Sequence, residues 1–288
     1  MYHKRFILIV LVLSILTLAC GIDLPFRTEE KTGETITDNI IIPQYGDPGE
    51  PTEITMKFGA GELYLAPGAG EAVLDGTATY NVEDFKPEIS IHGNQVEIST
   101  GSLAIDGIPK FNQKIKNVWD FSLGNQPIDL TIKAKAYVGE YELGGLHLVN
   151  LTISDGAAEV QLNFDQPNPG NMHTLRYETG ASNIALKKLG NANFDTMIFE
   201  SGAGNYDLDF TGDIRRDASI FIETGLSSLT ITVPEGINAQ VTLEGSMTNI
   251  TVWGNWEQNG NKYILTGNGP TFLITVEMSA GNLILRTE

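Results

Sequence analysis

One pattern constrains this chain more than any other: beyond residue 50, short segments of alternating apolar and polar side chains recur in a fixed register. Apolar residues stand five and three positions before the turn of each segment, and four and six positions after it. Alternation with a period of two is typical of β-strands that bury one face. The sequence therefore predicts an all-β protein. The turn positions of the aligned segments are Gly59, Tyr137, Gly156, Gly180, Gly202, Gly225, Ser246 and Ser279.

The spacing of these turns indicates how the segments are arranged. From Gly156 to Ser246 the turns fall 24, 22, 23 and 21 residues apart. A unit of about 22 residues with two short strands exposes its apolar face unless another unit stacks on it. Units stacked in register form a β-solenoid with coils about 4.8 Å apart. A β-sandwich is the alternative, because it also uses short strands and frequent turns. A sandwich does not require the same residue types at the same offset, so the constant register favours the solenoid.

The repeat also suggests domain limits. Residues 126–288 carry seven of the eight turn positions and are predicted to form the solenoid. The longer interval before Ser279 contains an Asn259-Gly260 dipeptide, which predicts a hairpin whose aromatic neighbours cap the open end of the stack. Residues 51–125 hold a single copy of the repeat among several short strands. We expect a small, distinct N-terminal β domain there.

The N-terminal residues predict export. Residues 1–5 (MYHKR) are basic, residues 6–16 (FILIVLVLSIL) are apolar, and Cys20 follows Ala19. This arrangement is typical of a secretion signal, and the apolar run is about half the ~20 residues that a membrane-spanning helix needs. The segment resembles the bacterial lipoprotein box, which implies removal of residues 1–19 and lipidation of Cys20. Cleavage by the ordinary signal peptidase is the alternative. Residues 20–50, rich in Thr, Glu, Pro and Gly, are predicted to be a flexible tether.

Charge and composition exclude several function classes. The chain has 36 acidic and 18 basic residues, and loss of Lys4 and Arg5 with the signal would give a net charge of 16 − 36 = −20. The negative electrostatic field of such a charge repels phosphates and so disfavours nucleic acid as a partner. A single cysteine rules out an internal disulfide. The three remaining histidines, His92, His147 and His173, lack metal-ligand spacing, and no nucleophile motif is present. We expect neither a cofactor nor catalysis, although a polysaccharide-cleaving β-helix stays open.

Outward positions of stacked coils should form columns along one face. Two positions before the turn, the column would contain Glu178, Glu200, Glu223 and Glu244, with carboxylates beginning about 4.8 Å apart. One hypothesis is that it attracts divalent cations or a cationic ligand; the other is that the side chains spread into solvent. Three positions after the turn, the pattern predicts a buried ladder of amide side chains. Its members are Asn183, Asn205, Ser228, Asn249 and Asn282.

Three segments carry a resemblance to a known family. Residues 54–68 (ITMKFGAGELYLAPG), 75–82 (DGTATYNV) and 86–90 (KPEIS) resemble the toast-rack family of bacterial envelope proteins. The later Gly-Ala-Gly coils are similar to its β-helical continuation, found in proteins proposed to be adhesins and in C-terminal domains of cell-wall stress regulators. The resemblance implies a location at the extracytoplasmic face of the envelope, with the membrane as a partner through lipid on Cys20.

The sequence as a whole favours a lipid-anchored surface protein that presents a rigid β-solenoid for binding or adhesion. This hypothesis rests on three predicted features: a secretion signal, a tether, and a regular stack of coils without a catalytic constellation. Its partner would be an extracellular protein or glycan. The alternative, an envelope-stress sensing module, is implied by the resemblance alone.

Overall fold

The strands of the protein form one continuous hydrogen-bonded sheet that folds back on itself. The computed structural model describes residues 32–45, 49–100, 115–245 and 249–288, which belong to one compact unit, Thr32–Glu288. Within these ranges the sheet has 17 strands. They are β1 (Ile36–Ile42), β2 (Thr52–Pro67), β3 (Leu74–Tyr80), β4 (Pro87–His92), β5 (Gln95–Thr100), β6 (Asn117–Leu123), β7 (Ile128–Glu142), β8 (Leu148–Asp155), β9 (Ala157–Asn163), β10 (Met172–Lys187), β11 (Phe194–Asp209), β12 (Ala218–Val233), β13 (Asn238–Gly245), β14 (Asn249–Trp253), β15 (Glu257–Asn259), β16 (Lys262–Leu265) and β17 (Thr271–Thr287). Two short 3₁₀ helices, η1 (Glu83–Phe85) and η2 (Leu189–Ala192), join them.

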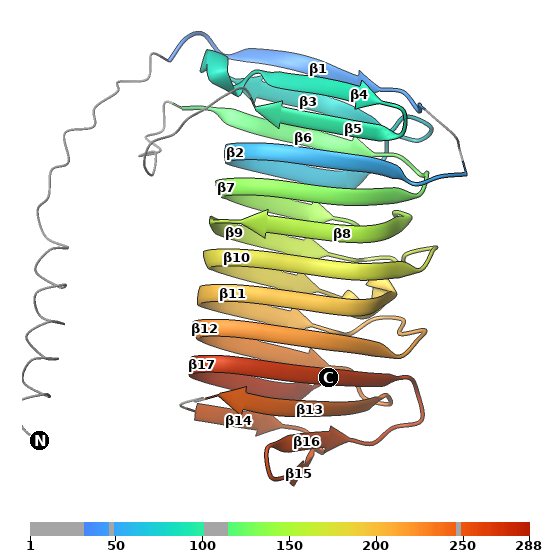
Figure 1. The fold of residues 1–288 in the computed structure, drawn as a ribbon, viewed down its shortest axis with the longest axis vertical. Coiled ribbons are helices and arrows are strands. Elements are labelled where there is room, and N and C mark those ends of the chain that lie inside the picture. Colours follow the sequence, from blue (N-terminus) through green and yellow to red (C-terminus); the bar gives the residue numbers. More distant parts are fainter. Residues whose placement is uncertain (1–31, 46–48, 101–114, 246–248) are drawn as a thin grey trace, which may run out of the picture. The chain divides into compact units, whose positions relative to one another are not determined.

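The long strands stack in parallel and in register, as Figure 1 shows for β7 to β12. Leu186 of β10 lies opposite Leu208 of β11, which lies opposite Ile231 of β12. Gly180, Gly202 and Gly225 stand at equivalent places, because the residues on either side of each are paired. The predicted β-solenoid is therefore confirmed. A β-sandwich is excluded, because its strands would not pair in parallel with the strand one repeat later.

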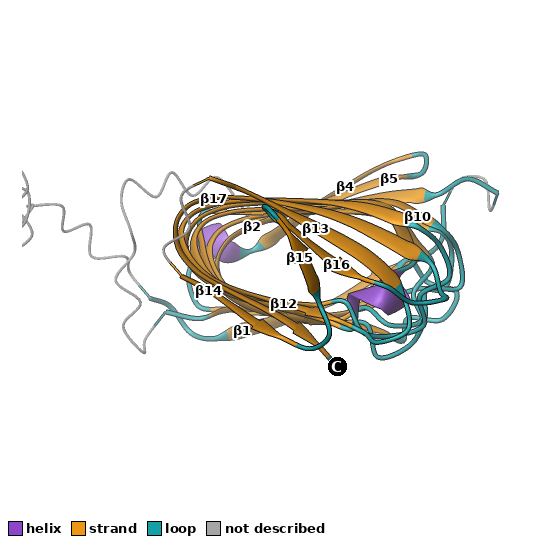
Figure 2. Cartoon of the chain, turned by 90° about the horizontal axis from the view of Figure 1, so that it is seen from below, coloured by secondary structure: helices purple, strands orange, loops and turns teal. Residues whose placement is uncertain are grey.

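Each long strand bends near its middle and contributes to two opposed layers, which Figure 2 shows in a view along the stack. Layer A contains β4, β5, β8, β13, β15, β16 and the first halves of β2, β7, β10, β11, β12 and β17. Layer B contains β1, β3, β6, β9, β14 and the second halves of those long strands. The apolar rows of both layers face the space between them.

Inward rows of apolar side chains fill that space. One row in layer A is paired residue by residue from β2 to β13, and every member is at most 1% exposed. Burial of one such side chain contributes about 1.5–3 kcal/mol. The register is thus set by the offsets that the sequence repeats. The row consists of Ile54, Leu130, Leu151, Leu175, Met197, Ile220, Ile274 and Val241.

Glycine occupies the bends because stacked bends lie very close together. A Cβ added to Gly202 would stand 2.4 Å from the carbonyl oxygen of Gly180, and one on Gly225 would stand 2.6 Å from that of Gly202. Real Cβ contacts are essentially never shorter than 3.0 Å. The coils can therefore stack this closely because the glycines at these turns have no Cβ.

At the N-terminal end, the structure corrects the expectation of a tether that extends to residue 50. Residues 36–42 form β1, which pairs antiparallel with β3. Ile40 and Ile42 are 6% and 2% exposed. Their burial explains why this part of the predicted tether is ordered: alternate residues of the strand reach the core, while Ile41 between them is 67% exposed.

The register predicted for β7 was displaced by two residues. Gly59 of β2 lies opposite Lys135, between the pairs Phe58–Ala134 and Ala60–Ala136, and Tyr137 is not its counterpart. A shift of two residues keeps the same side chains on the inner face, so alternation alone does not detect it. Because β2 pairs with β7 along both layers, residues on both sides of position 125 share one stack. A boundary of independent folding at residue 125 stays a prediction.

At the C-terminal end, the coils depart from chain order. The last strand, β17, lies between β12 and the pair β13 and β14, as Figure 1 shows. The repeated offsets of the sequence did not reveal this insertion. Phe272, Ile274 and Val276 of β17 carry the same inward pattern as the other coils, so this strand fits in the inner position. The predicted hairpin is confirmed: β15 and β16 pair around Asn259-Gly260, and β16 also pairs antiparallel with β13.

Candidate functional site

A column of side chains, all charged except Ser154, runs along the outer face of layer A. Its members lie directly opposite one another in eight neighbouring strands, two positions before the bend. The four predicted glutamates all belong to it. Sequence reasoning missed Glu277, which lies between Glu223 and Glu244 because β17 is inserted there, although its offset from Ser279 could have revealed it. In order, the column is Lys57, Lys133, Ser154, Glu178, Glu200, Glu223, Glu277 and Glu244.

Positive charge compensates only part of this column. Arg176, on the outer face of β10, pairs with Glu178 and donates from Nη2 to Oε2 of Glu200 at 3.0 Å. The side chains of Glu178 and Glu200 remain 38% and 43% exposed. In the part of the chain that the structure describes, neither Glu223, Glu277 nor Glu244 forms an ion pair. The C-terminal part of the column thus carries uncompensated negative charge.

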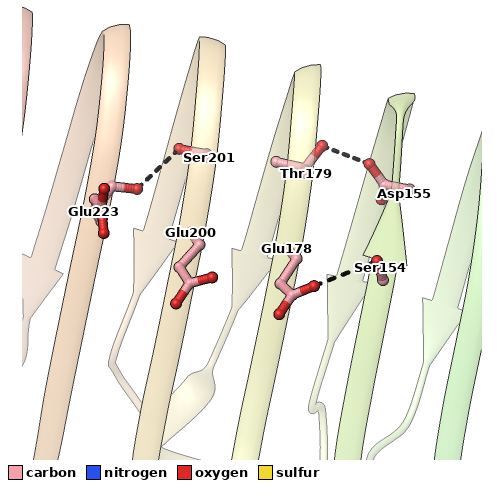
Figure 3. Close-up of a pocket in the computed structure, with 7 residues that line it drawn as sticks. All are labelled: Ser154, Asp155, Glu178, Thr179, Glu200, Ser201 and Glu223. Carbon is pink, nitrogen blue, oxygen red and sulfur yellow. Dashed lines mark hydrogen bonds between the residues drawn. The ribbon is translucent and has the colours of Figure 1, made fainter.

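A shallow pocket of about 450 Å³ opens beside the middle of the column, and Figure 3 shows its lining. Ser154 Oγ donates to Oε2 of Glu178 at 3.4 Å, and Ser201 Oγ donates to the carbonyl oxygen of Glu223 at 3.4 Å. Every side chain that lines the pocket carries a carboxylate or a hydroxyl group. The lining residues are Ser154, Asp155, Glu178, Thr179, Glu200, Ser201 and Glu223. Such a surface suits a positively charged group and repels an anion.

Asp155, at the end of β8, places a buried carboxylate under this pocket. Its Oδ2 accepts hydrogen bonds from the hydroxyls of Tyr177 at 2.8 Å and Tyr137 at 3.4 Å. Its Oδ1 accepts from Thr179 and, at 3.4 Å, from Ser182. Burial raises the pKa of Asp155 above its ordinary value, although these hydrogen bonds act in the opposite direction. Burial also raises the pKa of the Tyr137 and Tyr177 hydroxyls well above their usual range.

Sequence reasoning did not single out Asp155. It stands one position before the bend, an inward offset at which the next three coils have Thr179, Ser201 and Thr224. An acidic residue in an inward row of hydroxyl side chains was the signal that could have identified it. The network connects three strands through hydroxyls and one carboxylate, and so stiffens the bend beneath the pocket.

The other predicted positions do not assemble into a reactive site. His92 lies in β4, His147 precedes β8, and His173 lies in β10, where its ring faces Asp195 at 3.4 Å. Within the described ranges, no group of three or more His, Cys, Asp or Glu side chains is arranged to hold a metal ion.

The predicted buried amide ladder is wrong in one respect. Its residues do stack in register, from Asn183 and Asn205 through Ser228 to Asn282 and Asn249. However, all four asparagines are exposed. The position three residues after the bend alternates with inward positions, so it lies on the outer face of layer B.

A family model identifies the chain. The N-terminal domain of toast_rack matches residues 30–174, which is half of the sequence. The chain belongs to the toast-rack family. The match includes all three segments on which the resemblance was based, and it extends from β1 into β10.

Two solved structures are similar to this chain at low sequence identity. A candidate cell adhesion protein from Clostridium sporogenes ATCC 15579 is 16% identical, with a TM-score of 0.50 over 88% of this chain and 100% of that one. A candidate adhesin from Bacteroides fragilis NCTC 9343 is 11% identical, with a TM-score of 0.41 over 87% of this chain and 97% of that one. At such identities the similarity concerns the fold alone. No match to a curated protein was found.

The predicted signal, residues 1–19, and the predicted lipidation residue, Cys20, lie outside the described residues. Among the residues that are described, no helix has the length and apolar character needed to cross a bilayer.

Proposed function

We propose that this toast-rack protein is a bacterial envelope protein, anchored by lipid on Cys20, that presents its β-solenoid as a non-catalytic module for binding or adhesion. The observation that carries the proposal is the stack itself: rows of side chains repeat at the strand spacing over an uninterrupted outer face. Such a face provides an extended recognition surface. The signal pattern and Cys20 support export and anchoring.

Anchoring is tested by replacing Cys20→Ser in cells that express the full chain. The wild type should incorporate radiolabelled palmitate and partition into the detergent phase of Triton X-114. The variant should lose both properties, because the thiol is the acceptor for the lipid. Thr17→Leu, which leaves Ala19 and the Cys20 thiol in place, is the matched control and should keep the label. An unlabelled wild type in the aqueous phase would disprove lipid anchoring.

Binding is tested by deleting the gene and measuring attachment to protein-coated and glycan-coated surfaces. Attachment should fall and should return when the full chain is restored. Susceptibility to antibiotics that inhibit cell-wall synthesis is measured in the same strains. A changed antibiotic response with unchanged attachment would favour the alternative, envelope-stress sensing. Release of soluble sugar from polysaccharide by the purified chain would contradict a non-catalytic module.

A further inference from the structure

A band of apolar side chains lies on the outer face of layer A, where the other rows are polar. Phe221 of β12 and Leu273 of β17 are each 51% exposed. Leu273 lies opposite Ser219, two residues from Phe221, so the two side chains are diagonal neighbours. Ile198, which is partly buried, lies opposite Phe221 on the other side. Ile264 of β16, which is partly buried, lies in the same row as Leu273, two strands further on and beyond Gln240 of β13. We call Ile198, Phe221, Leu273 and Ile264 the apolar band.

The band is a local exception within its own rows. Corresponding positions in neighbouring strands contain Thr152, Thr174 and Thr275, whose hydroxyls are suited to a solvated sheet face. Exposed apolar side chains are ordinary when they are scattered, whereas a contiguous group on one sheet face marks an interaction site. Ile198, Phe221 and Leu273 adjoin one another on β11, β12 and β17, and Gln240 of β13 separates Leu273 from Ile264 of β16.

The uncompensated part of the glutamate column runs beside the band. Glu223 is two residues after Phe221 in β12, and Glu277 is four residues after Leu273 in β17. Glu244 continues the column on β13. Among the described residues, Arg176 and Lys262 place positive charge at the borders of this surface: Arg176 pairs with Glu178 and Glu200, and Lys262 lies in β16. A partner that covers the band must therefore place cationic groups about 4.8 Å apart along its side.

We propose that the apolar band and Glu223, Glu277 and Glu244 form a docking face for a polypeptide segment that carries Lys or Arg beside apolar side chains. The inference rests on the proposed binding function and specifies its surface and partner class. The net charge of −18 argues for a basic partner and against a second copy of this chain. The glutamates likewise disfavour nucleic acid and anionic lipid. One stripe of an amphipathic helix advances about 5.4 Å per turn, close to the spacing of the carboxylates.

The test measures binding of a fluorescent amphipathic helical peptide of Leu and Lys to Thr32–Glu288, since all described strands pair within that unit. Two control peptides replace Leu by Ser, or Lys by Glu. The Leu and Lys peptide should bind at least tenfold more tightly than either control. Phe221→Ser with Leu273→Ser should weaken its binding at least tenfold. Glu223→Gln with Glu277→Gln should weaken binding at least fivefold and reduce its dependence on salt.

Val138→Ser with Glu140→Gln is the matched control, because both residues are exposed on the outer face of layer B. Its affinity for the peptide should stay within twofold of the wild type, and all variants should keep the wild-type circular dichroism. Equal binding of a control peptide, or wild-type affinity in the layer A variants, would overturn the docking face. A wild-type dimer that these variants dissociate in analytical ultracentrifugation would also overturn it, since a second copy would then occupy the face. If docking fails while cell attachment persists, only this inference falls; if attachment itself is absent, the proposed function falls.

Discussion

At the scale of single residues, Asp155 is the position where burial and chemistry conflict most. Asp155 is 9% exposed, and its carboxylate accepts hydrogen bonds from four hydroxyl groups, with no described residue as an ion-pair partner. Burial without a cation disfavours the charged form. At neutral pH the buried charge of Asp155 therefore destabilises the fold. The hydrogen bonds from the four hydroxyl groups offset part of this cost.

Asp155→Asn should remove a pH dependence from the stability of the fold. Because the pKa of Asp155 is raised in the folded state, its contribution is most favourable below the ordinary value of 3.8 and is lost as pH rises through the raised value. The unfolding free energy of the wild type minus that of the variant should thus fall between pH 4 and pH 7, by about 1.4 kcal/mol per unit of pKa shift. Urea unfolding of both proteins measures it. A difference that grows with pH would show that the hydrogen bonds outweigh burial.

Gly202→Ala should destabilise the stack by about 1–3 kcal/mol, because its Cβ would overlap the Gly180 carbonyl. Gly59→Ala is the matched control: it stands at the equivalent bend of β2, but the nearest atom to its Cβ is the Thr100 hydroxyl at 3.4 Å. We expect that change to cost less than about 0.5 kcal/mol. Equal losses in urea unfolding would mean that the bends do not set the coil spacing.

At the scale of strands, the sequence predicts which side chains face the core better than it predicts which residues of adjacent strands lie opposite one another. The repeated offsets place Gly180, Gly202, Gly225 and Ser279 in the register that the structure shows. The same pattern assigned Tyr137 two residues too late. Both outcomes have one cause: alternation determines which side chains point inward, and any shift by an even number of residues satisfies it.

Glu223→Gln should stabilise the protein at low ionic strength. Glu223 lies between Glu200 and Glu277, and carboxylates about 4.8 Å apart repel by roughly 0.9 kcal/mol per pair in water. Side-chain spreading reduces this, so we expect a gain of about 0.5–1 kcal/mol in urea unfolding at 10 mM salt. The gain should vanish at 1 M NaCl, where screening acts within about 3 Å.

Calcium serves as the control for the glutamate column. CaCl₂ and NaCl at equal ionic strength should raise the melting temperature equally, because no group of described residues is arranged to hold a metal ion. A further rise that only Ca²⁺ produces, and that Glu223→Gln abolishes, would instead support the cation-binding hypothesis. If the Gln variants are more stable but bind the peptide more weakly, the repulsion between neighbouring glutamates costs stability and serves recognition.

At the scale of the whole molecule, the sequence predicted the solenoid, its two-strand unit and most of the glutamate column, but not the order of its coils. Each coil presents nearly the same inward rows, so β17 and β13 bury similar side chains in either position. What distinguishes them is length: β17 continues through the bend into layer B, whereas β13 and β14 are separate strands. Local patterning does not encode that choice, and it likewise misses Asp155, whose hydrogen-bond partners come from two other strands, β7 and β10.

The insertion of β17 predicts that truncation after residue 270 abolishes the fold. If coils stacked in chain order, loss of the last strand would merely expose a new end. Here the loss opens a gap between β12 and the pair β13 and β14. It also removes Phe272, Ile274, Val276, Met278, Leu283 and Leu285, each at most 2% exposed. At about 1.5–3 kcal/mol for each buried side chain, the loss matches or exceeds the typical stability of a domain, about 5–15 kcal/mol.

The truncated chain should therefore show no cooperative urea transition and should be digested rapidly by protease. Truncation at the other terminus is the control: removal of residues 1–31 leaves every described strand in place and should preserve a single cooperative transition. A cooperative transition in the chain that ends at residue 270 would mean that β13 and β14 can close directly onto β12. In that case β17 would be an exchangeable coil, and the order of the stack would be a matter of folding kinetics and not of stability.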